Sequence, residues 1–261
     1  MILDQFTHAD CLDAMRELPD EVIDLVVTSP PWDRLKTYGG GNLLSWDKFC
    51  KIADQLFRIS KTGGVICWHW QDQTQKGVLS GTGSRMHVRL MDVGFSSHCV
   101  IVIPIRNFGG HKSYVHPQFV HVLSKGRPKT VQMIKDRLNK RPGYNRSILR
   151  REVDGTRKRR QTGMVRSHRA RDSIWNYDDR YFGSIEKIAQ KHPCPMHERL
   201  AQDLIYSWSK EGEMVLDPFG GTATTCKVAA LMGRHYLGYE IVEEYWRLGS
   251  ERLKRHVGLA S

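Results

Sequence analysis

Residues 24–32 read DLVVTSPPW, and this stretch decides the fold class when it is set beside residues 213–225, EMVLDPFGGTATT. Each stretch has a short apolar run that is typical of a buried strand, and each run ends in turn-forming residues. Around them, segments with helical spacing of apolar side chains alternate with further strand-like runs. This alternation predicts an α/β protein with a doubly wound, mostly parallel sheet that is covered on both faces.

One helix follows the first of these strands closely. Residues 46–64, WDKFCKIADQLFRISKTGG, have apolar side chains at helical spacing. Two glycines close the segment, and glycine commonly ends a helix. We therefore expect this helix to stop at Gly63 and Gly64.

Composition excludes several classes of protein. The hydrophobic fraction is 40%, and no stretch approaches the roughly 18 consecutive apolar residues of a membrane span. The N-terminus lacks the basic and apolar regions of a signal peptide. The six cysteines are scattered without a Cys-x-x-Cys pair, which fits neither a disulfide framework nor a zinc finger. We expect a reduced, cytoplasmic protein with no membrane association and no metal site.

One segment carries most of the positive charge. The net charge is +12, and residues 125–171 hold 17 lysines and arginines against three acids, a local excess of 14. The rest of the chain therefore carries about −2. A basic segment beside a near-neutral body predicts an arm for a polyanion, with a solvated loop as the alternative. Interleaved apolar side chains give the arm material to pack with: Met133, Ile134, Leu138, Tyr144, Ile148, Leu149 and Val153.

Four polar side chains mark expected strand ends: Asp10, Ser29, Asp217 and Glu240. Ligands of such sheets bind outside the carboxyl ends of the strands. The glycines after Asp217 open a helix, where backbone N–H groups favour a negatively charged part of a ligand. No lysine follows them, so this is not a triphosphate loop. An acid about 20 residues further on suits the two hydroxyls of a ribose, which predicts a nucleoside ligand with a modest charged tail.

TSPPW followed by DPFGGT resembles the amino-methylating DNA methyltransferases, which use S-adenosylmethionine to modify N4 of cytosine or N6 of adenine. The catalytic motif comes first and the cofactor glycines last, which is similar to the beta arrangement of this family. The resemblance implies a circularly permuted Rossmann-like domain. Residues 1–124 would be its catalytic half, 125–175 an inserted target-recognition region, and 176–261 its cofactor-binding half.

The resemblance also implies the site residues. The acid matching Asp10 contacts the adenine of the cofactor, and Cys11 is expected to pack beside that pocket. The stretch HPCPMHERL resembles an element that holds the methionine end of the cofactor, with His197 where the family often has proline. The expected cofactor-binding residues are Asp10, Cys11, Asp217, Pro218, Phe219, Gly220, Gly221, Thr222 and Glu240. The expected catalytic residues are Ser29, Pro30, Pro31 and Trp32.

The catalytic motif has a physical rationale. The exocyclic amine of cytosine or adenine is a poor nucleophile because its lone pair is delocalised into the ring. Two acceptors, the Ser29 hydroxyl and the Pro30 carbonyl, can hold its N–H bonds and aim the lone pair at the sulfonium methyl. The two prolines stiffen the segment and cannot continue a strand ladder. Trp32 offers a face for the flipped base, with stacking worth roughly 1–3 kcal/mol.

The target base and the substrate class leave alternatives open. Within the family, serine before the prolines is commoner among N4-cytosine enzymes, and Asp or Asn among N6-adenine enzymes, so the resemblance favours cytosine. Adenine stays an alternative. So do an RNA or protein-amide substrate and, from another class, a non-catalytic DNA-binding regulator.

The basic arm is expected to bind double-stranded DNA. Phosphate contacts supply affinity, and a few side chains at base edges supply sequence choice. The candidates for base edges are Arg146, Arg150, Asn145 and Gln161, and the sequence does not rank them. The expected DNA-binding residues are Lys36, Tyr38, Arg146, Arg150, Arg157, Lys158, Arg159 and Arg160. We expect a nucleoid-associated monomer or homodimer, with a cognate restriction endonuclease as a compatible companion.

Overall fold

The computed structural model describes residues 3–31, 44–105, 116–177 and 186–257. The chain divides into two compact units, which are described separately below. The larger unit contains Met1–Gln132 and Ser173–Ser261, and the smaller contains Met133–Asp172. The expected insert, 125–175, is therefore wider than the smaller unit by a few residues at each end.

Within the described residues, the larger unit is built on a seven-stranded sheet. Five neighbouring strands run parallel, and the next strand, β7, runs antiparallel to both of its neighbours. In sheet order the strands are β1 (Gln5–His8), β13 (His235–Glu240), β12 (Met214–Asp217), β2 (Ile23–Thr28), β3 (Ser60–Trp70), β7 (Gln118–Ser124) and β6 (Ser96–Ile103). The predicted fold class, α/β with a mostly parallel doubly wound sheet, is confirmed.

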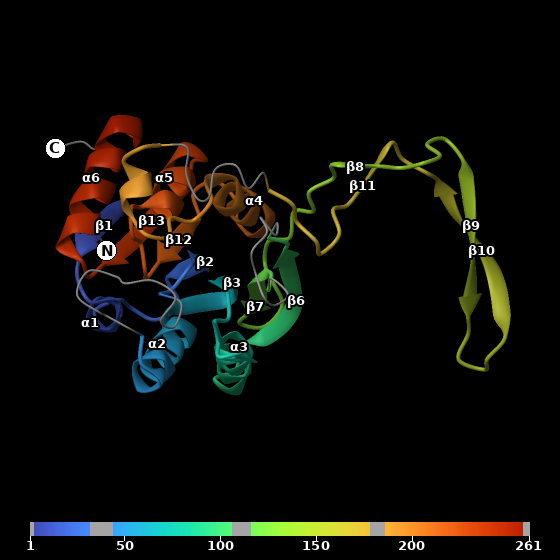
Figure 1. Ribbon diagram of the computed structural model, residues 1–261. Coiled ribbons are helices and arrows are strands. Elements are labelled where there is room, and N and C mark those ends of the chain that lie inside the picture. The colour runs from blue at the N-terminus through green and yellow to red at the C-terminus, as the bar shows by residue number, and fades with distance from the viewer. Residues whose placement is uncertain (1–2, 32–43, 106–115, 178–185, 258–261) are drawn as a thin grey trace. The chain divides into compact units, whose positions relative to one another are not determined.

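Helices cover both faces of this sheet (Figure 1). On one face lie α4 (Glu198–Trp208), α5 (Thr224–Leu231) and α6 (Glu243–Val257), and on the other α1 (Cys11–Arg16), α2 (Trp46–Ile59) and α3 (Thr82–Asp92). A single turn of 3-10 helix spans Ala189–Lys191, and a small hairpin joins β4 (Thr74–Gln75) to β5 (Val78–Leu79). In the described ranges, no helix combines the length and the apolar character that a membrane crossing needs.

Hydrophobic burial explains why β2 lies at the centre. All of its residues, Ile23–Thr28, are buried, as expected for a strand that is covered by helices on both faces. On one face, α2 packs Phe49, Ile52 and Leu56 toward the core at helical spacing. The indole of Trp68 in β3 is fully buried against Phe49, with ring centroids 5.4 Å apart.

The expected glycine stop of α2 is wrong. The helix ends at Ile59, and the chain passes directly into β3, so that Gly63 and Gly64 lie within the strand. Ile23 pairs with Ser60 but Leu25 pairs with Val65, which means that β3 carries extra residues opposite β2. Gly63 has φ +86°. The glycines therefore permit an irregular bulge in a buried strand and do not cap the helix.

The smaller unit contains an antiparallel hairpin of β9 (Asn145–Arg151) and β10 (Arg157–Met164). A second, two-residue pairing joins β8 (Arg137–Leu138) to β11 (His168–Arg169). The expectation that apolar side chains pack the arm is wrong for most of them. Those exposed are Met133, Leu138, Tyr144, Leu149 and Val153. A two-stranded ribbon by itself has no second layer to cover its side chains.

Candidate functional site

A hydrogen bond joins the two sequence stretches that decide the fold. Strands β2 and β12 are parallel neighbours, with Val26 beside Leu216, so both end at the same edge of the sheet. At that edge, the Thr28 hydroxyl donates to Asp217 Oδ1 over 2.6 Å, although the two residues are 189 positions apart. The chain therefore leaves the sheet from both strands side by side, with Ser29 after Thr28 and Pro218 after Asp217.

Asp217 is buried, with 4% of its surface exposed. Its Oδ1 also accepts the backbone N–H of Phe219 over 3.1 Å. Burial raises the pKa of this carboxyl, and the hydroxyls of Thr28 and Thr225 and the Phe219 N–H oppose the rise by stabilising the charged form. The sequence indicated Asp217, but its partner Thr28 was missed even though it directly precedes Ser29.

A small hollow of about 20 Å³ opens beside this bond. Several of the expected residues line it. They come from the ends of β2 and β12 and from the turn before α5: Ser29, Asp217, Phe219, Gly220, Gly221 and Thr222. The HPCPM stretch supplies the facing wall with His192, Cys194, Pro195 and Met196. The structure thus brings Ser29 of one motif to the glycines of the other.

His192 is held tightly in that wall. Its Nδ1 accepts the Cys194 N–H over 3.2 Å, and its ring meets the ring of Tyr245 edge-on, with centroids 4.5 Å apart. Burial lowers its pKa to about 4, so the imidazole is neutral near pH 7. Within the described ranges, no three histidine, cysteine or acidic side chains gather in a way that would hold a metal ion.

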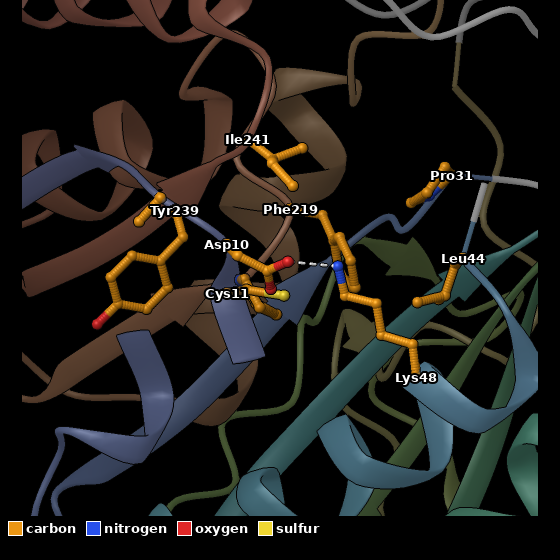
Figure 2. A pocket seen from close by; sticks show the side chains of 10 residues that line it. Asp10, Cys11, Pro31, Leu44, Lys48, Phe219, Tyr239 and Ile241 are labelled. Atoms are coloured by element: carbon orange, nitrogen blue, oxygen red, sulfur yellow. Dashed lines mark hydrogen bonds and ion pairs between the residues drawn. The ribbon is translucent and has the colours of Figure 1, made fainter. Parts of the chain in front are cut away.

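A second, larger hollow has a volume of about 100 Å³, and Figure 2 shows the residues that line it. Five of its lining residues were expected at the site: Asp10, Cys11, Pro31, Pro218 and Phe219. The others are Ala9, Leu44, Lys48, Tyr239 and Ile241. Phe219 lines both hollows, so the two form adjoining parts of one site along the carboxyl edge of the sheet.

Asp10 has two distinct partners. Its Oδ1 caps α1 by accepting the Leu12 N–H over 2.9 Å, and its Oδ2 accepts a proton of Lys48 Nζ over 2.6 Å. Figure 2 shows this ion pair at the larger hollow, with Lys48 reaching it from α2. Sequence reasoning missed Lys48, because a lysine in the first turns of an amphipathic helix has the same pattern as any solvated surface lysine.

Cys11 packs beside Asp10 and is 5% exposed. Burial, with a smaller contribution from the Asp10 carboxylate, raises the pKa of its thiol to about 12. The side chain is therefore a protonated, apolar wall of the larger hollow near pH 7, and it lacks the thiolate of a nucleophilic cysteine.

Glu240 is buried and lines neither hollow itself, but it is bonded to a residue that lines one of them. Its Oε2 accepts the Gly221 N–H over 2.7 Å, and its Oε1 accepts the Val242 N–H over 2.8 Å. Gly221 lines the smaller hollow, while the chain neighbours of Glu240, Tyr239 and Ile241, line the larger one. Burial raises the pKa of this carboxyl, and backbone N–H groups of Val242, Gly221 and Ile241 oppose the rise.

Different physical constraints require glycine at the two positions of the turn, Gly220 and Gly221. A Cβ at Gly220 would lie 2.5 Å from the ring of Phe6 in β1, and the same ring would meet a Cβ at Gly249 over 2.5 Å. Gly220 is thus required for packing against Phe6. The sequence predicted this glycine only for the close approach of a ligand. Gly221 has φ +52°, a conformation that favours glycine, and it faces His192.

A buried arginine supports this turn from below. Arg252 of α6 is fully buried, and its Nη1 donates to the Thr222 carbonyl over 2.9 Å and to Thr224 Oγ1 over 2.8 Å. Its charge is balanced by Glu186 at 3.0 Å and Glu198 at 2.5 Å. The helical spacing of the sequence could have indicated that Arg252 is buried, since it lies on the same face of α6 as Tyr245, Gly249 and Leu253.

The predicted catalytic residue Trp32 lies outside the described residues. So do two of the predicted DNA-binding residues, Lys36 and Tyr38. Those of the basic arm are all exposed on the β9–β10 hairpin: Arg146, Arg150, Arg157, Lys158, Arg159 and Arg160.

We predict that Thr28→Val destabilises the protein, because it removes the hydroxyl donor from buried Asp217. The pKa of the Asp217 carboxyl is higher in the folded protein than in the unfolded chain, so the free energy of unfolding falls as the pH rises through that folded-state pKa. Loss of the Thr28 donor raises this pKa further, because the charged form loses a hydrogen bond. The free energy of unfolding should fall by about 1–3 kcal/mol, with a larger loss at pH 8 than at pH 5. Denaturant titrations at both pH values measure this.

The matched control is Thr7→Val on edge strand β1, where the side chain is exposed. That change should stay within about 0.5 kcal/mol. If Thr28→Val cost no more than the control, the Thr28–Asp217 bond would not be the constraint that we describe.

Comparison with known proteins identifies the family. A family model described as DNA methylase, for N6 and N4 methyltransferases, matches residues 23–251. The orphan methyltransferase M.BamHII of Bacillus amyloliquefaciens is 36% identical over 249 residues, which cover 91% of each chain. The DNA adenine methyltransferase YhdJ of Escherichia coli is 25% identical and covers 94% of this chain and 81% of its own.

Solved structures share the fold. The PvuII DNA methyltransferase, described as cytosine-N4-specific, aligns with a TM-score of 0.68 at 21% identity over 95% of this chain and 85% of its own. M1.HpyAVI, solved as a complex with S-adenosylmethionine, aligns with a TM-score of 0.62 at 19% identity over 95% and 98%. Since the family model spans most of the chain, this protein belongs to the N6/N4 family of DNA methyltransferases.

Proposed function

We propose that this enzyme transfers a methyl group from S-adenosylmethionine to N4 of a cytosine that is flipped out of duplex DNA. One observation carries the proposal: the Thr28–Asp217 bond fixes the SPP motif beside the glycine turn. Ser29 and Gly221 thereby line one hollow, while Pro31 and Asp10 line the adjoining one.

The larger hollow suits the adenine of the cofactor. Phe219, Ile241 and Leu44 offer the apolar walls that a flat heterocycle needs, and the Asp10 carboxylate offers an acceptor for its amine. Lys48 occupies one lone pair of Asp10 Oδ2 and the Leu12 N–H occupies one of Oδ1, so each oxygen keeps one lone pair for another donor. The bound cofactor supplies an electrophilic methyl group on a sulfonium centre.

Glu240 would hold the ribose. The N–H groups of Gly221 and Val242 fix its carboxylate in orientation, and its neighbours Gly221 and Tyr239 line the smaller and the larger hollow. The carboxylate would accept hydrogen bonds from the ribose hydroxyls. The turn at Gly220 and Gly221, held by Arg252 beneath Thr222, would lie against the charged end together with the HPCPM wall.

Ser29 and Pro30 would act on the target amine. Strand β2 ends at Thr28, so the backbone oxygens of the following residues are released from the ladder, and Pro31 has no N–H to compete for them. The Ser29 hydroxyl and the Pro30 carbonyl would each accept one N–H of the amine and direct its lone pair toward the methyl group. As the N–C bond forms, the bond from the methyl carbon to sulfur would break, the neutral thioether S-adenosylhomocysteine would leave, and the amine would lose one proton to solvent water. Preorganised acceptors of this kind contribute a few kcal/mol to a barrier.

Two observations bear on the choice of base. The neutral Ser29 before the prolines and the similarity in fold to a cytosine-N4-specific enzyme support cytosine. The similarity over most of the chain to a DNA adenine methyltransferase supports N6 of adenine as the second candidate.

Labelled methyl transfer to duplex DNA, followed by nucleoside digestion and mass spectrometry, tests both points. We expect N4-methylcytosine from the wild-type enzyme, and a loss of about 100-fold or more in kcat for Ser29→Ala, because one acceptor is removed. Ser97→Ala, at an exposed position of β6, is the control and should keep full activity.

Three results of that experiment would count against the proposal. If the only product were N6-methyladenine, the target base would be adenine and not cytosine. Unchanged activity of Ser29→Ala would remove the assigned role of the hydroxyl. DNA binding without any methyl transfer would favour a non-catalytic regulator.

Cofactor binding tests the larger hollow separately. Asp10→Asn keeps an N-cap for α1 but removes the carboxylate, so the affinity for S-adenosylmethionine should fall roughly 5- to 10-fold, or about 1 kcal/mol. Asp47→Asn, on the exposed face of α2, is the matched control and should leave the affinity unchanged. Isothermal titration calorimetry measures both affinities. If the two variants bound S-adenosylmethionine equally well, Asp10 would not contact the adenine.

A further inference from the structure

The register of the β9–β10 hairpin sorts its side chains into two sets. Residues that lie directly opposite each other in an antiparallel pair share a face, and successive residues along a strand alternate between faces. Gln161 pairs with Ser147, Arg159 with Leu149, and Lys158 with Arg150. The two faces of the hairpin therefore differ in chemistry.

One face, here called the amide face, holds all the neutral hydrogen-bonding side chains of the paired strands outside the bulge. It consists of Asn145, Ser147, Leu149, Arg151, Arg157, Arg159, Gln161 and Met164. The opposite face, here called the cation face, consists of Arg146, Ile148, Arg150, Lys158 and Arg160. Glu152, which directly follows β9, joins this face through its ion pair with Arg160. Except for Ile148 and Glu152, which are half-buried, these side chains are exposed.

A β-bulge fixes the amide face at its open end. Gln161 pairs with Ser147, but Gly163 pairs with Arg146, so Thr162 is an extra residue. The Thr162 hydroxyl donates to the Arg146 carbonyl over 2.9 Å, and Gly163 has the φ of +83° that the irregular backbone needs. The bulge places Met164 opposite Asn145, so that Asn145 lies on the same side of the ribbon as Gln161.

We propose that this hairpin lies in the major groove of DNA with its amide face toward the base edges. This inference rests on the proposed function, since it names how the methyltransferase selects its sequence. The major groove is about 12 Å wide and admits a two-stranded ribbon. Asn and Gln can pair with adenine, Arg with guanine, and an apolar side chain such as Leu149 with the thymine methyl group.

The cation face then supplies affinity without sequence choice. Arg146, Arg150 and Lys158 carry long side chains that can bend toward the phosphates along the groove rims. No Asn or Gln lies among them to read a base edge. Arg160 is partly balanced by Glu152 at 3.0 Å, which leaves the other cations of this face as the principal phosphate contacts. Double-stranded RNA is excluded by this geometry, since its major groove is too deep and narrow for a ribbon.

The structure thus ranks candidates that the sequence left equal. Asn145 and Gln161 are assigned to base edges. Arg146 and Arg150, which the sequence presented as equally good candidates for base edges, are assigned to phosphates.

Selection of bound duplexes from a random DNA library, with S-adenosylhomocysteine present, tests this assignment without requiring methyl transfer. We expect the wild-type enzyme to select a consensus. Asn145→Ala and Gln161→Ala should each lose roughly 5- to 150-fold of discrimination at one or two positions of that consensus. Their slope of log affinity against log salt concentration should stay unchanged.

Arg150→Ala is the matched variant on the opposite face. It should keep the consensus and reduce the salt slope by about 0.9, because one phosphate contact is lost. The inference is overturned if Arg150→Ala relaxes the consensus while the two amide variants keep it, or if none of the three changes it. It is also overturned if the wild-type enzyme selects no consensus, or if duplex RNA competes as well as DNA.

Failure of the proposed function gives a different result. A wild-type protein that selects a consensus but transfers no methyl group would contradict the proposed catalysis, while the face assignment would still be decided by the variants.

Discussion

The hydrogen bond from Thr28 to Asp217 is the constraint on which the site depends. It lies where the parallel strands β2 and β12 end side by side. There the Thr28 hydroxyl of β2 donates a hydrogen bond to the buried carboxyl group of Asp217 in β12. Because the two residues are far apart in sequence, the bond can form only when β2 and β12 have paired in register. The pairing that builds the core therefore also assembles the SPP motif and the glycine turn, so fold and site form together.

Packing behind the turn sets its position. Phe6 of β1 fills the space that side chains at Gly220 and Gly249 would need, so strand β1, the turn and α6 approach closely. Arg252 then holds the turn from α6 through the Thr222 carbonyl, and its charge is matched by Glu186 and Glu198. A buried arginine without such partners would be strongly unfavourable. The turn with the sequence GGTAT is thereby held by packing from β1 and by hydrogen bonds from α6.

Sequence reasoning found those parts of the site that follow from strand direction. Asp10, Ser29 and Asp217 stand at strand ends, and parallel strands bring their ends to one edge, so pattern alone predicted their proximity. Contacts that depend on three-dimensional packing were missed. The Lys48–Asp10 ion pair joins two helices, and Arg252 is hidden in a helix that is rich in exposed charge. At Gly63 and Gly64 the sequence predicts a helix end, because a glycine pair has the same local pattern at the end of a helix and in a strand bulge. The hairpin of the arm has alternating cations on both faces, and without apolar alternation it gave no strand signal.

The central claim is that the two adjoining hollows hold one cofactor whose reactive end faces Ser29 and Pro30. A crystal structure of the protein with S-adenosylmethionine tests it most directly. The account predicts the adenine beside Phe219 and Asp10, the ribose hydroxyls on Glu240, and the sulfonium methyl group directed at the Ser29 hydroxyl. A cofactor bound elsewhere, or one bound with its sulfonium end turned away from Ser29, would contradict it.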